Sequence, residues 1–305
     1  MPAPIRLRLF ENYRFVLYAP FYAAHATGAY EAEGLDVELL PSPGPGRAEA
    51  AVLAGEADVM WMGPIRIMKA HEQDPACPLT AFAEVVCRDP FSLVGGKPNP
   101  GFKLADLART RFASVSEVPT PWLCLTEDIR RAGLDPDHLD RVTDRGMGEN
   151  VAALHAGALP AAQMFEPFVE EAVRGGAHIW QQSSARGLTS YTVFATHRDR
   201  LARNPEPYRR MARAMARTQK WVGTQPVGAL AGAIRSYFPD LDRGVLEGSL
   251  ARYKSQGVWA TDPRLPEEGF LCLQRALLSS GFLARPVPYA DCVDNRFAEE
   301  AMAEG

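Results

Sequence analysis

The sequence of 305 residues has no apolar run approaching the roughly 18 residues that a membrane-spanning helix needs. Its N-terminus, MPAPIRLRLF, has two arginines but lacks both the apolar core of about 7–15 residues and the small-residue cleavage site of a secretory signal peptide. We therefore expect a chain that does not span a membrane. Its predicted location is periplasmic or otherwise extracytoplasmic if a signal peptide was removed, and cytoplasmic if not.

Cysteine is scarce, and its spacing argues against a metal site. The number of cysteines is odd, no two form a C-x-x-C pair, and the six histidines are scattered. A zinc site needs clustered ligands, so we predict no metal and no cofactor. Free buried thiols are the simplest interpretation. The cysteines are Cys77, Cys87, Cys124, Cys272 and Cys292.

Catalytic and nucleic-acid signatures are also missing. The sequence has no glycine-rich phosphate loop, no G-x-S-x-G nucleophile elbow and no H-E-x-x-H motif. A net charge of −4 gives no reason to expect nucleic acid or an anionic membrane as a partner. A regulator is disfavoured too, because no helix-turn-helix pattern is visible.

Short strand-like and helical segments alternate through the first half of the chain. Ile5–Phe10 and Leu35–Leu40 alternate apolar and polar residues, as strands do. Residues 18–30 are typical of a helix, and the predicted strand at 57–62 leads into a helix that begins at Pro64. This order predicts an α/β fold in which helices connect the strands of a sheet.

Two stretches of the sequence are alike. Residues 51–64 and 153–167 each contain the end of a small-residue helix, a glycine, a strand and a proline. As the same unit in two α/β halves, they predict two lobes built alike. After a predicted strand at 189–197 the chain becomes almost entirely helical. Apolar residues there recur every three or four positions and predict a buried helix face: Tyr208, Met211, Met215, Thr218 and Val222.

Five segments, taken in order, resemble the nitrate, sulfonate and thiamine-pyrimidine class of ABC-transporter binding proteins. They are APFYAAHATGAYEAEGLDVELL, LAGEADVMWMGP, LADLARTRFASVS, AALHAGALPAAQMFEP and RYKSQGVWATDP. The resemblance implies a type II periplasmic-binding-protein-like fold, with two α/β lobes joined by two hinge crossovers and a helical C-terminal part. Lobe 1 would contain residues 1–88 and 190–305, and lobe 2 residues 89–189. The crossovers would lie near residues 86–92 and 188–192.

One branch of this family synthesises the thiamine pyrimidine and carries a lysine and a histidine after the strand at 57–62. In this chain Met62 and Arg66 stand at those places, and no cysteine-rich run occurs near residues 189–196. Lys69 and His71 lie about one helical turn further on and are expected to face solvent. These departures from the pattern of that branch therefore argue against synthase activity.

Candidate site residues lie at the carboxyl ends of the predicted strands, where helix N-termini offer free N–H groups. Tyrosine and tryptophan can stack on a ring, and arginine can pair with an anion. Each residue also has a structural explanation, such as core packing, helix capping or a solvated surface. The candidates are Asn12, Tyr13, Tyr18, Trp61, Met62, Gly63, Arg66, Arg88, Ser116, Thr120, Trp122, Glu166 and Tyr191.

The resemblance, together with these residues, implies a solute-binding protein that holds one small molecule between its lobes and is recognised, when closed, by the membrane component of an ABC transporter. Trp61 would line one side of the cleft, and the Glu166 carboxylate could accept two N–H bonds from an aminopyrimidine. A thiamine-precursor pyrimidine is therefore the first expected ligand. A sulfonate or carboxylate, held by Arg66 or Arg88, is the second. The alternative is a cytoplasmic enzyme of thiamine-pyrimidine or aromatic metabolism on the same fold.

Overall fold

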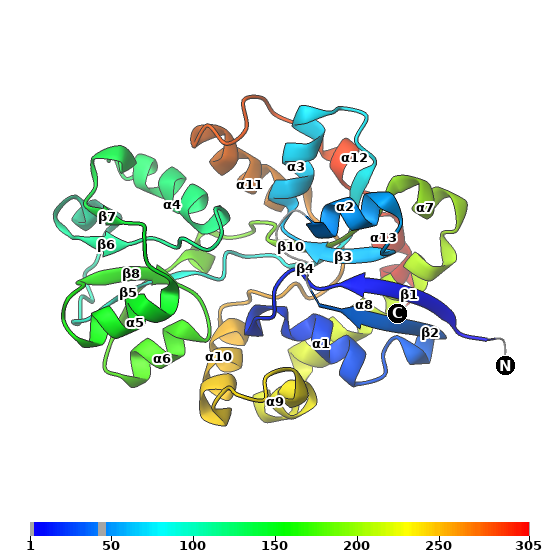
Figure 1. The fold of residues 1–305 in the computed structure, drawn as a ribbon, viewed down its shortest axis with the longest axis horizontal. Helices are drawn as coiled ribbons and strands as arrows, with labels where there is room; N and C mark the ends of the chain where they lie inside the picture. Colours follow the sequence, from blue (N-terminus) through cyan, green and yellow to red (C-terminus); the bar gives the residue numbers. More distant parts are fainter. Residues whose placement is uncertain (1–2, 42–46, 305) are drawn as a thin grey trace.

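The protein folds into two α/β lobes, each built on one five-stranded sheet (Figure 1). The computed structural model describes residues 3–41 and 47–304. The run PSPGPG at residues 41–46, whose prolines and glycines predict a turn, therefore falls almost entirely outside the described residues.

The sheet of lobe 1 has the strand order β2-β1-β3-β10-β4. β1 pairs in parallel with β2 and β3, whereas β10 runs antiparallel to both β3 and β4. The strands are β1 (Ile5–Phe10), β2 (Leu35–Leu40), β3 (Val59–Met62), β4 (Leu79–Val86) and β10 (Thr192–His197).

The sheet of lobe 2 repeats this arrangement in the order β7-β6-β8-β5-β9, with β5 as the antiparallel strand. β3 and β8 hold the same central position, and they belong to the two similar stretches of sequence. The expected likeness of the two lobes is thus confirmed at the level of topology. The strands are β5 (Ser92–Gly95), β6 (Phe112–Ala113), β7 (Arg141–Val142), β8 (Ala161–Met164) and β9 (His178–Gln182).

The chain crosses between the lobes twice, and the two crossovers run side by side. The Tyr191 amide donates to the Val86 carbonyl at 2.9 Å, and the Thr189 amide donates to the Cys87 carbonyl at 2.8 Å. Each crossover leads directly into the antiparallel strand of the sheet it enters, β5 or β10. Residues 189–191 were predicted as part of a strand. They belong to the crossover, and β10 begins at Thr192.

Helices cover both sheets, and the two predicted helix starts, at residue 18 and at Pro64, are matched by helices that begin at Ala19 and Pro64. Those of the first half and lobe 2 are α1 (Ala19–Ala26), α2 (Arg47–Ala54), α3 (Pro64–Gln73), α4 (Thr120–Arg131), α5 (Met147–His155) and α6 (Phe168–Arg174). Those after the second crossover are α7 (Arg198–Arg203), α8 (Glu206–Thr224), α9 (Val227–Ile234), α10 (Arg243–Ser255), α11 (Glu267–Ser279), α12 (Tyr289–Cys292) and α13 (Arg296–Ala303). The predicted helix at 18–30 is shorter, because Gly28 takes a positive φ of 73° after α1.

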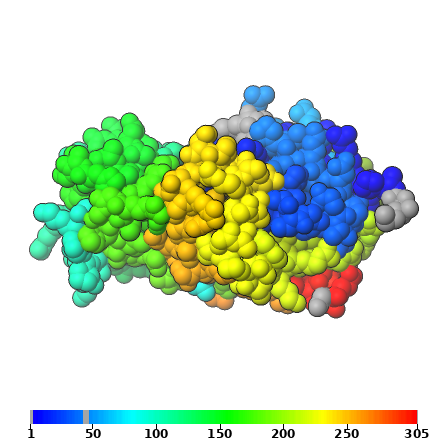
Figure 2. All heavy atoms as spheres, turned by 90° about the horizontal axis from the view of Figure 1, so that it is seen from below, coloured from blue at the N-terminus to red at the C-terminus, as the bar shows by residue number. Residues whose placement is uncertain are grey.

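The helical C-terminal part packs against lobe 1 and also touches lobe 2. Every residue of the predicted apolar stripe on α8 is buried, which confirms it as a core face. α11 packs on α4, and α10 packs on α6. Figure 2 shows α9 and α10 (yellow and orange) adjoining the green residues of lobe 2. The two lobes are therefore held together on two sides of the crossovers. Within the described part of the chain, no helix is both long and apolar enough to cross a bilayer.

Candidate functional site

A cavity of about 260 Å³ lies where residues of both lobes meet at the crossovers; we call it the cleft cavity. It is lined by the loop after β1, the start of α3, the start of α4 and the beginning of β10. Its lining residues are Asn12, Tyr13, Tyr18, Gly63, Ile65, Arg66, Val118, Pro119, Thr120, Tyr191, Thr192 and Phe282.

Lobe 1 supplies the aromatic and basic side of the cleft cavity. Asn12, Tyr13 and Tyr18 follow β1, while Gly63 and Arg66 follow β3. Because β1 and β3 are parallel neighbours, their carboxyl ends bring these two loops to the same edge of the sheet.

Lobe 2 and the second crossover supply the facing side. Val118, Pro119 and Thr120 form the approach to α4, so the first turn of this helix is directed at the cavity. Tyr191 and Thr192 come from the crossover itself. A ligand in the cleft cavity would therefore touch both lobes and the segment that joins them.

Two tyrosine hydroxyls give the cavity neutral hydrogen-bonding groups. The Asn12 side-chain amide donates to the Tyr18 hydroxyl at 3.4 Å. The buried Tyr191 hydroxyl has no partner among the described residues. Burial raises the pKa of Tyr18 to about 12 and the pKa of Tyr191 well above its ordinary value, so both hydroxyls keep their protons at neutral pH.

Arg66 is the cation of the cleft cavity. It pairs with Glu49 of α2, whose carboxylate lies on the lobe 1 side. A guanidinium has five N–H donors, and one carboxylate oxygen does not occupy them all. Arg66 is thus fixed in place and still able to bind an anion.

The structure brings seven of the predicted residues into the cleft cavity and leaves the others outside. Those inside are Asn12, Tyr13, Tyr18, Gly63, Arg66, Thr120 and Tyr191. Those outside its lining are Trp61, Met62, Arg88, Ser116, Trp122 and Glu166.

Trp61 was expected to line the cleft, but it is fully buried in lobe 1. Its ring stacks on Phe21 with the ring centroids 4.6 Å apart. Met62 points to the opposite face of β3 and joins a second apolar cluster. Both faces of β3 are covered, so alternation along this strand does not expose either side chain.

Glu166 was expected to face the ligand, but its carboxylate is occupied within the protein. It pairs with Arg252 of α10, and it accepts from the Ser249 hydroxyl at 3.1 Å and from the Glu170 amide at 3.0 Å. Glu166 is 1% exposed, so no face is left for a ligand. This network joins lobe 2 to the C-terminal part.

The remaining three predicted residues have local structural roles. Arg88 donates to the Ser184 carbonyl at 3.4 Å, and the Ser116 hydroxyl donates to the Arg145 carbonyl at 2.9 Å. The guanidinium of Arg141 lies over the ring of Trp122, with its central carbon 3.9 Å from the ring centroid.

His71 was expected to face solvent, and this was wrong. It is 3% exposed, and its Nε2 lies 2.8 Å from the Leu79 carbonyl oxygen. Lys69 pairs with Glu72 and donates to the Phe282 carbonyl at 2.9 Å. Both side chains are therefore engaged in packing α3 against its neighbours.

Within residues 3–41 and 47–304, no group of three or more His, Cys, Asp or Glu side chains is placed to hold a metal ion. All five cysteines are free thiols, and four of them are buried.

Sequence reasoning missed five residues of the cleft cavity. Ile65, Val118, Pro119 and Thr192 adjoin predicted residues, so the strand-end rule could have included them. Phe282 follows α11 and reaches the cavity from the C-terminal part, and no local sequence signal marks it.

Two lobes with matching topology, two crossovers and a cavity between them define a type II periplasmic-binding-protein fold. The family profile described as NMT1/THI5 like matches residues 17–229. The chain therefore belongs to the NMT1/THI5-like family.

Known proteins with similar sequence or structure span nearly the whole chain. YtlA of Bacillus subtilis strain 168, which is named as a binding protein, is 25% identical over 302 residues, covering 98% of this chain and 90% of YtlA. The ligand-binding component of an ABC-type import system from Staphylococcus aureus superposes with a TM-score of 0.73 at 15% identity, covering 97% and 99% of the two chains.

Two further solved structures share the fold. The alkanesulfonate-binding protein SsuA from Xanthomonas axonopodis pv. citri, bound to MOPS, gives a TM-score of 0.71 at 16% identity, covering 97% of this chain and 100% of SsuA. The desulfurization enzyme DSZB gives 0.72 at 15% identity, covering 98% and 99%. The fold thus carries both binding proteins and an enzyme.

Proposed function

We propose that this chain is a solute-binding protein that holds a small organic anion with an aromatic ring in the cleft cavity and presents it to the membrane component of an ABC-type importer. The observation that carries the proposal is the composition of the cavity. Three tyrosines, one arginine and the first turn of a helix from each lobe surround it. Such a receptor acts outside the cytoplasm, so we propose an extracytoplasmic location.

The charge of the cavity supports an anionic ligand. Arg66 lies in its lining, paired with one carboxylate oxygen of Glu49, and the described lining residues themselves include no Asp or Glu. The starts of α3 and α4 add the positive ends of two helix dipoles and the remaining first-turn N–H groups, since Pro64 and Pro121 carry none. A sulfonate or carboxylate would accept hydrogen bonds from these groups and from the Tyr18 and Tyr191 hydroxyls.

The same observations make a cationic or amidine-like pyrimidine the weaker choice. Its expected partner was the Glu166 carboxylate, which is bound to Arg252 and lies outside the cavity lining. The related fold of SsuA, a protein named for alkanesulfonate binding, also supports a sulfonate.

The aromatic lining and the volume support a single ring. Tyr13, Tyr18 and Tyr191 line the cavity, and tyrosine rings can stack on an aromatic ligand. The volume of about 260 Å³ is just below the roughly 300 to 1,000 Å³ of drug-sized ligand pockets, which suits a small ligand.

The cavity is lined by residues of both lobes and of the crossover, and this supports closure of the lobes by a hinge motion. A ligand that contacts lobe 1, lobe 2 and the crossover stabilises the arrangement in which the lobes meet. The membrane component would then recognise the closed form, a role supported by the fold shared with the Staphylococcus aureus import component.

The enzymatic alternative has less support from the lining. Its described residues include no cysteine, histidine or carboxylate that could act as a nucleophile or base. Because the enzyme DSZB shares the fold, the experiment also tests whether the protein converts its ligand to a product.

The experiment is a thermal-shift screen with benzenesulfonate, benzoate, neutral benzamide and a 4-aminopyrimidine, followed by mass spectrometry of each mixture. We expect the two anions to raise the melting temperature in a saturable way and to be recovered unchanged. Stabilisation by the aminopyrimidine alone would overturn the ligand class. Conversion of a ligand to product would overturn the binding role.

A further inference from the structure

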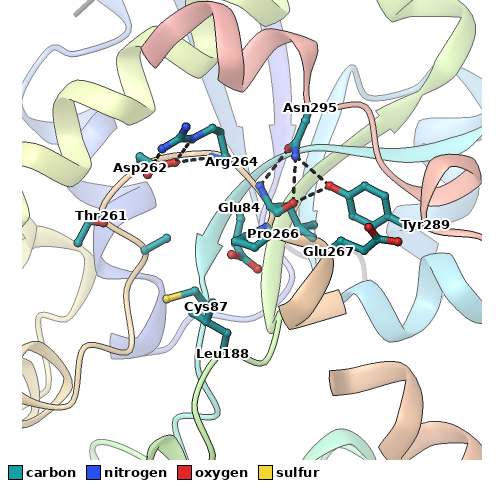
Figure 3. A pocket seen from close by; sticks show the side chains of 12 residues that line it. Glu84, Cys87, Leu188, Thr261, Asp262, Arg264, Pro266, Glu267, Tyr289 and Asn295 are labelled. Carbon is teal, nitrogen blue, oxygen red and sulfur yellow. Dashed lines mark hydrogen bonds and ion pairs between the residues drawn. The ribbon is translucent and has the colours of Figure 1, made fainter. Parts of the chain in front are cut away.

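A second cavity, of about 370 Å³, opens on lobe 1 beside the crossovers and shares no lining residue with the cleft cavity. Figure 3 shows its side chains. It is lined by Glu84, Cys87, Leu188, Ala260, Thr261, Asp262, Arg264, Leu265, Pro266, Glu267, Tyr289 and Asn295.

Glu84 is the buried acid of this cavity. It interrupts the apolar strand β4, LTAFAEVV, and is 1% exposed. Among the described residues its Oε1 has no hydrogen-bond partner; the hydroxyl of Ser190 lies nearby and partly offsets the effect of burial on the pKa of Glu84. Leaving a buried polar group unpaired costs folding free energy. A ligand that donates to Glu84 would remove that cost.

The other charged side chains leave the cavity short of cations. Arg264 is held by Asp262, which accepts from its Nε at 2.9 Å and its Nη2 at 3.0 Å. Glu267 at the exposed rim forms no ion pair within the described residues. Two carboxyl groups, Glu84 and Glu267, thus have no basic partner in the described part of the chain.

The neutral polar groups are already committed. The Tyr289 hydroxyl donates to the Leu265 carbonyl at 2.6 Å, and the Asn295 side-chain amide donates to the same carbonyl at 2.9 Å. The Cys87 thiol lies 3.7 Å from the Gly257 and Val258 carbonyl oxygens. Available hydrogen-bonding capacity is therefore concentrated on acceptors.

We propose that this cavity is a second binding site, which takes a small primary ammonium compound, with Glu84 accepting its N–H groups and Glu267 adding a carboxylate at the rim. A short alkyl group on the ligand would contact the apolar lining at Leu188, Ala260 and Pro266. The site is separate from the cleft cavity, so this proposal does not depend on the proposed receptor function.

Binding at Glu84 is coupled to a proton. Burial raises the pKa of Glu84 to about 8, so at neutral pH the carboxyl group keeps its proton while the cavity is empty. An ammonium ion favours the carboxylate, and one proton passes to solvent as the complex forms. Below pH 8 the affinity should therefore rise about tenfold per pH unit.

None of the neighbouring groups whose pKa is shifted changes its ionisation in the pH range in which Glu84 does. Hydrogen bonds from Arg264 lower the pKa of Asp262, and burial raises the pKa values of Cys87 and Tyr289 to about 12. An alkylammonium ion, like lysine, keeps its proton up to about pH 10. The other charged groups that face the cavity or its rim are Arg264, Glu267 and, on α13, Glu299.

The test is an NMR titration of the uniformly ¹⁵N-labelled full chain with n-butylammonium chloride at pH 6.5 and 7.5. Sodium chloride at the same concentration and n-butanol are the matched controls. We expect saturable shifts of the amides of Leu188, Thr261 and Leu265, with about tenfold higher affinity at pH 7.5. Shifts that never saturate, equal binding of n-butanol, or an affinity independent of pH would overturn the proposal.

The substitution E84Q keeps the shape of the side chain and removes the carboxylate. We expect at least tenfold weaker binding and no pH dependence, whereas E38Q on β2, at the edge of the lobe 1 sheet, should bind as the wild type does. Unchanged affinity in folded E84Q protein would contradict the site. If E84Q does not fold, the pH dependence of the wild type decides.

Discussion

Glu166, just after β8, is buried and forms an ion pair with the partly buried Arg252 in α10, which joins lobe 2 to the C-terminal part. Arg252 also reaches Glu170 at 2.7 Å, and Ser249 donates to Glu166. The carboxylate is thus satisfied by the protein itself. It fixes how α10 lies against lobe 2 and does not face the ligand.

Arg252→Ala should destabilise the protein by about 3–5 kcal/mol, because Glu166 would remain buried without its cation. Urea unfolding followed by circular dichroism measures this. Arg243→Ala on the same helix is the control, since Arg243 forms only an exposed pair with Glu247 and should cost under about 1 kcal/mol. An equal loss of stability in the two variants would show that the pair with Glu166 stabilises the protein no more than an exposed pair does.

Tyr191→Phe should weaken binding of the anion about fivefold and leave stability unchanged or slightly higher. The hydroxyl has no partner in the described part of the protein, so its removal breaks no internal hydrogen bond. Tyr30→Phe is the control, because the Tyr30 hydroxyl is also buried and unpartnered but lies in the lobe 1 core. Calorimetric titration of both variants with benzenesulfonate makes the comparison; identical affinities would remove Tyr191 from the site.

Arg66→Ala should weaken binding of benzenesulfonate roughly 10–100-fold, the value of hydrogen bonds to a charged group. Neutral benzenesulfonamide, which has nearly the same shape, should lose much less. Calorimetric titration of both compounds against both proteins isolates the charge interaction. An equal loss of affinity for the two compounds would mean that Arg66 acts through packing only.

The stability of the wild type should fall as pH rises from about 5 to 8, relative to E84Q. The pKa of Glu84 is 4.5 in its ordinary state and about 8 in the folded protein. Between these values the unfolded chain has released the proton and the folded chain still holds it, so each pH unit costs about 1.4 kcal/mol. Urea unfolding of both proteins across this range gives the difference. Parallel pH profiles would show that Glu84 ionises in the folded state as it does in the unfolded chain.

The sequence predicted the architecture because its signals are local. Glycine and proline mark the ends of helices and strands, and the likeness between residues 51–64 and 153–167 pointed to two similar lobes. It also predicted much of the cleft cavity, since parallel strands bring the loops after β1 and β3 to one sheet edge.

The wrong predictions depended on distant parts of the chain. Trp61 lies on a strand covered on both faces, so position in the strand says nothing about exposure. Glu166 meets Arg252, 86 residues further along, and no local pattern reports such a pairing. Glu84 did carry a signal, a single acid in an otherwise apolar run from Phe82 to Val86, which marks a buried polar position.

The central claim, an aromatic anion held between the lobes, is tested most directly by a crystal structure of the protein grown with benzenesulfonate. We predict difference density in the cleft cavity, with the sulfonate at Arg66 and the helix starts and the ring among Tyr13, Tyr18 and Tyr191. An empty cleft cavity at saturating ligand, or a ligand bound elsewhere, would contradict the account.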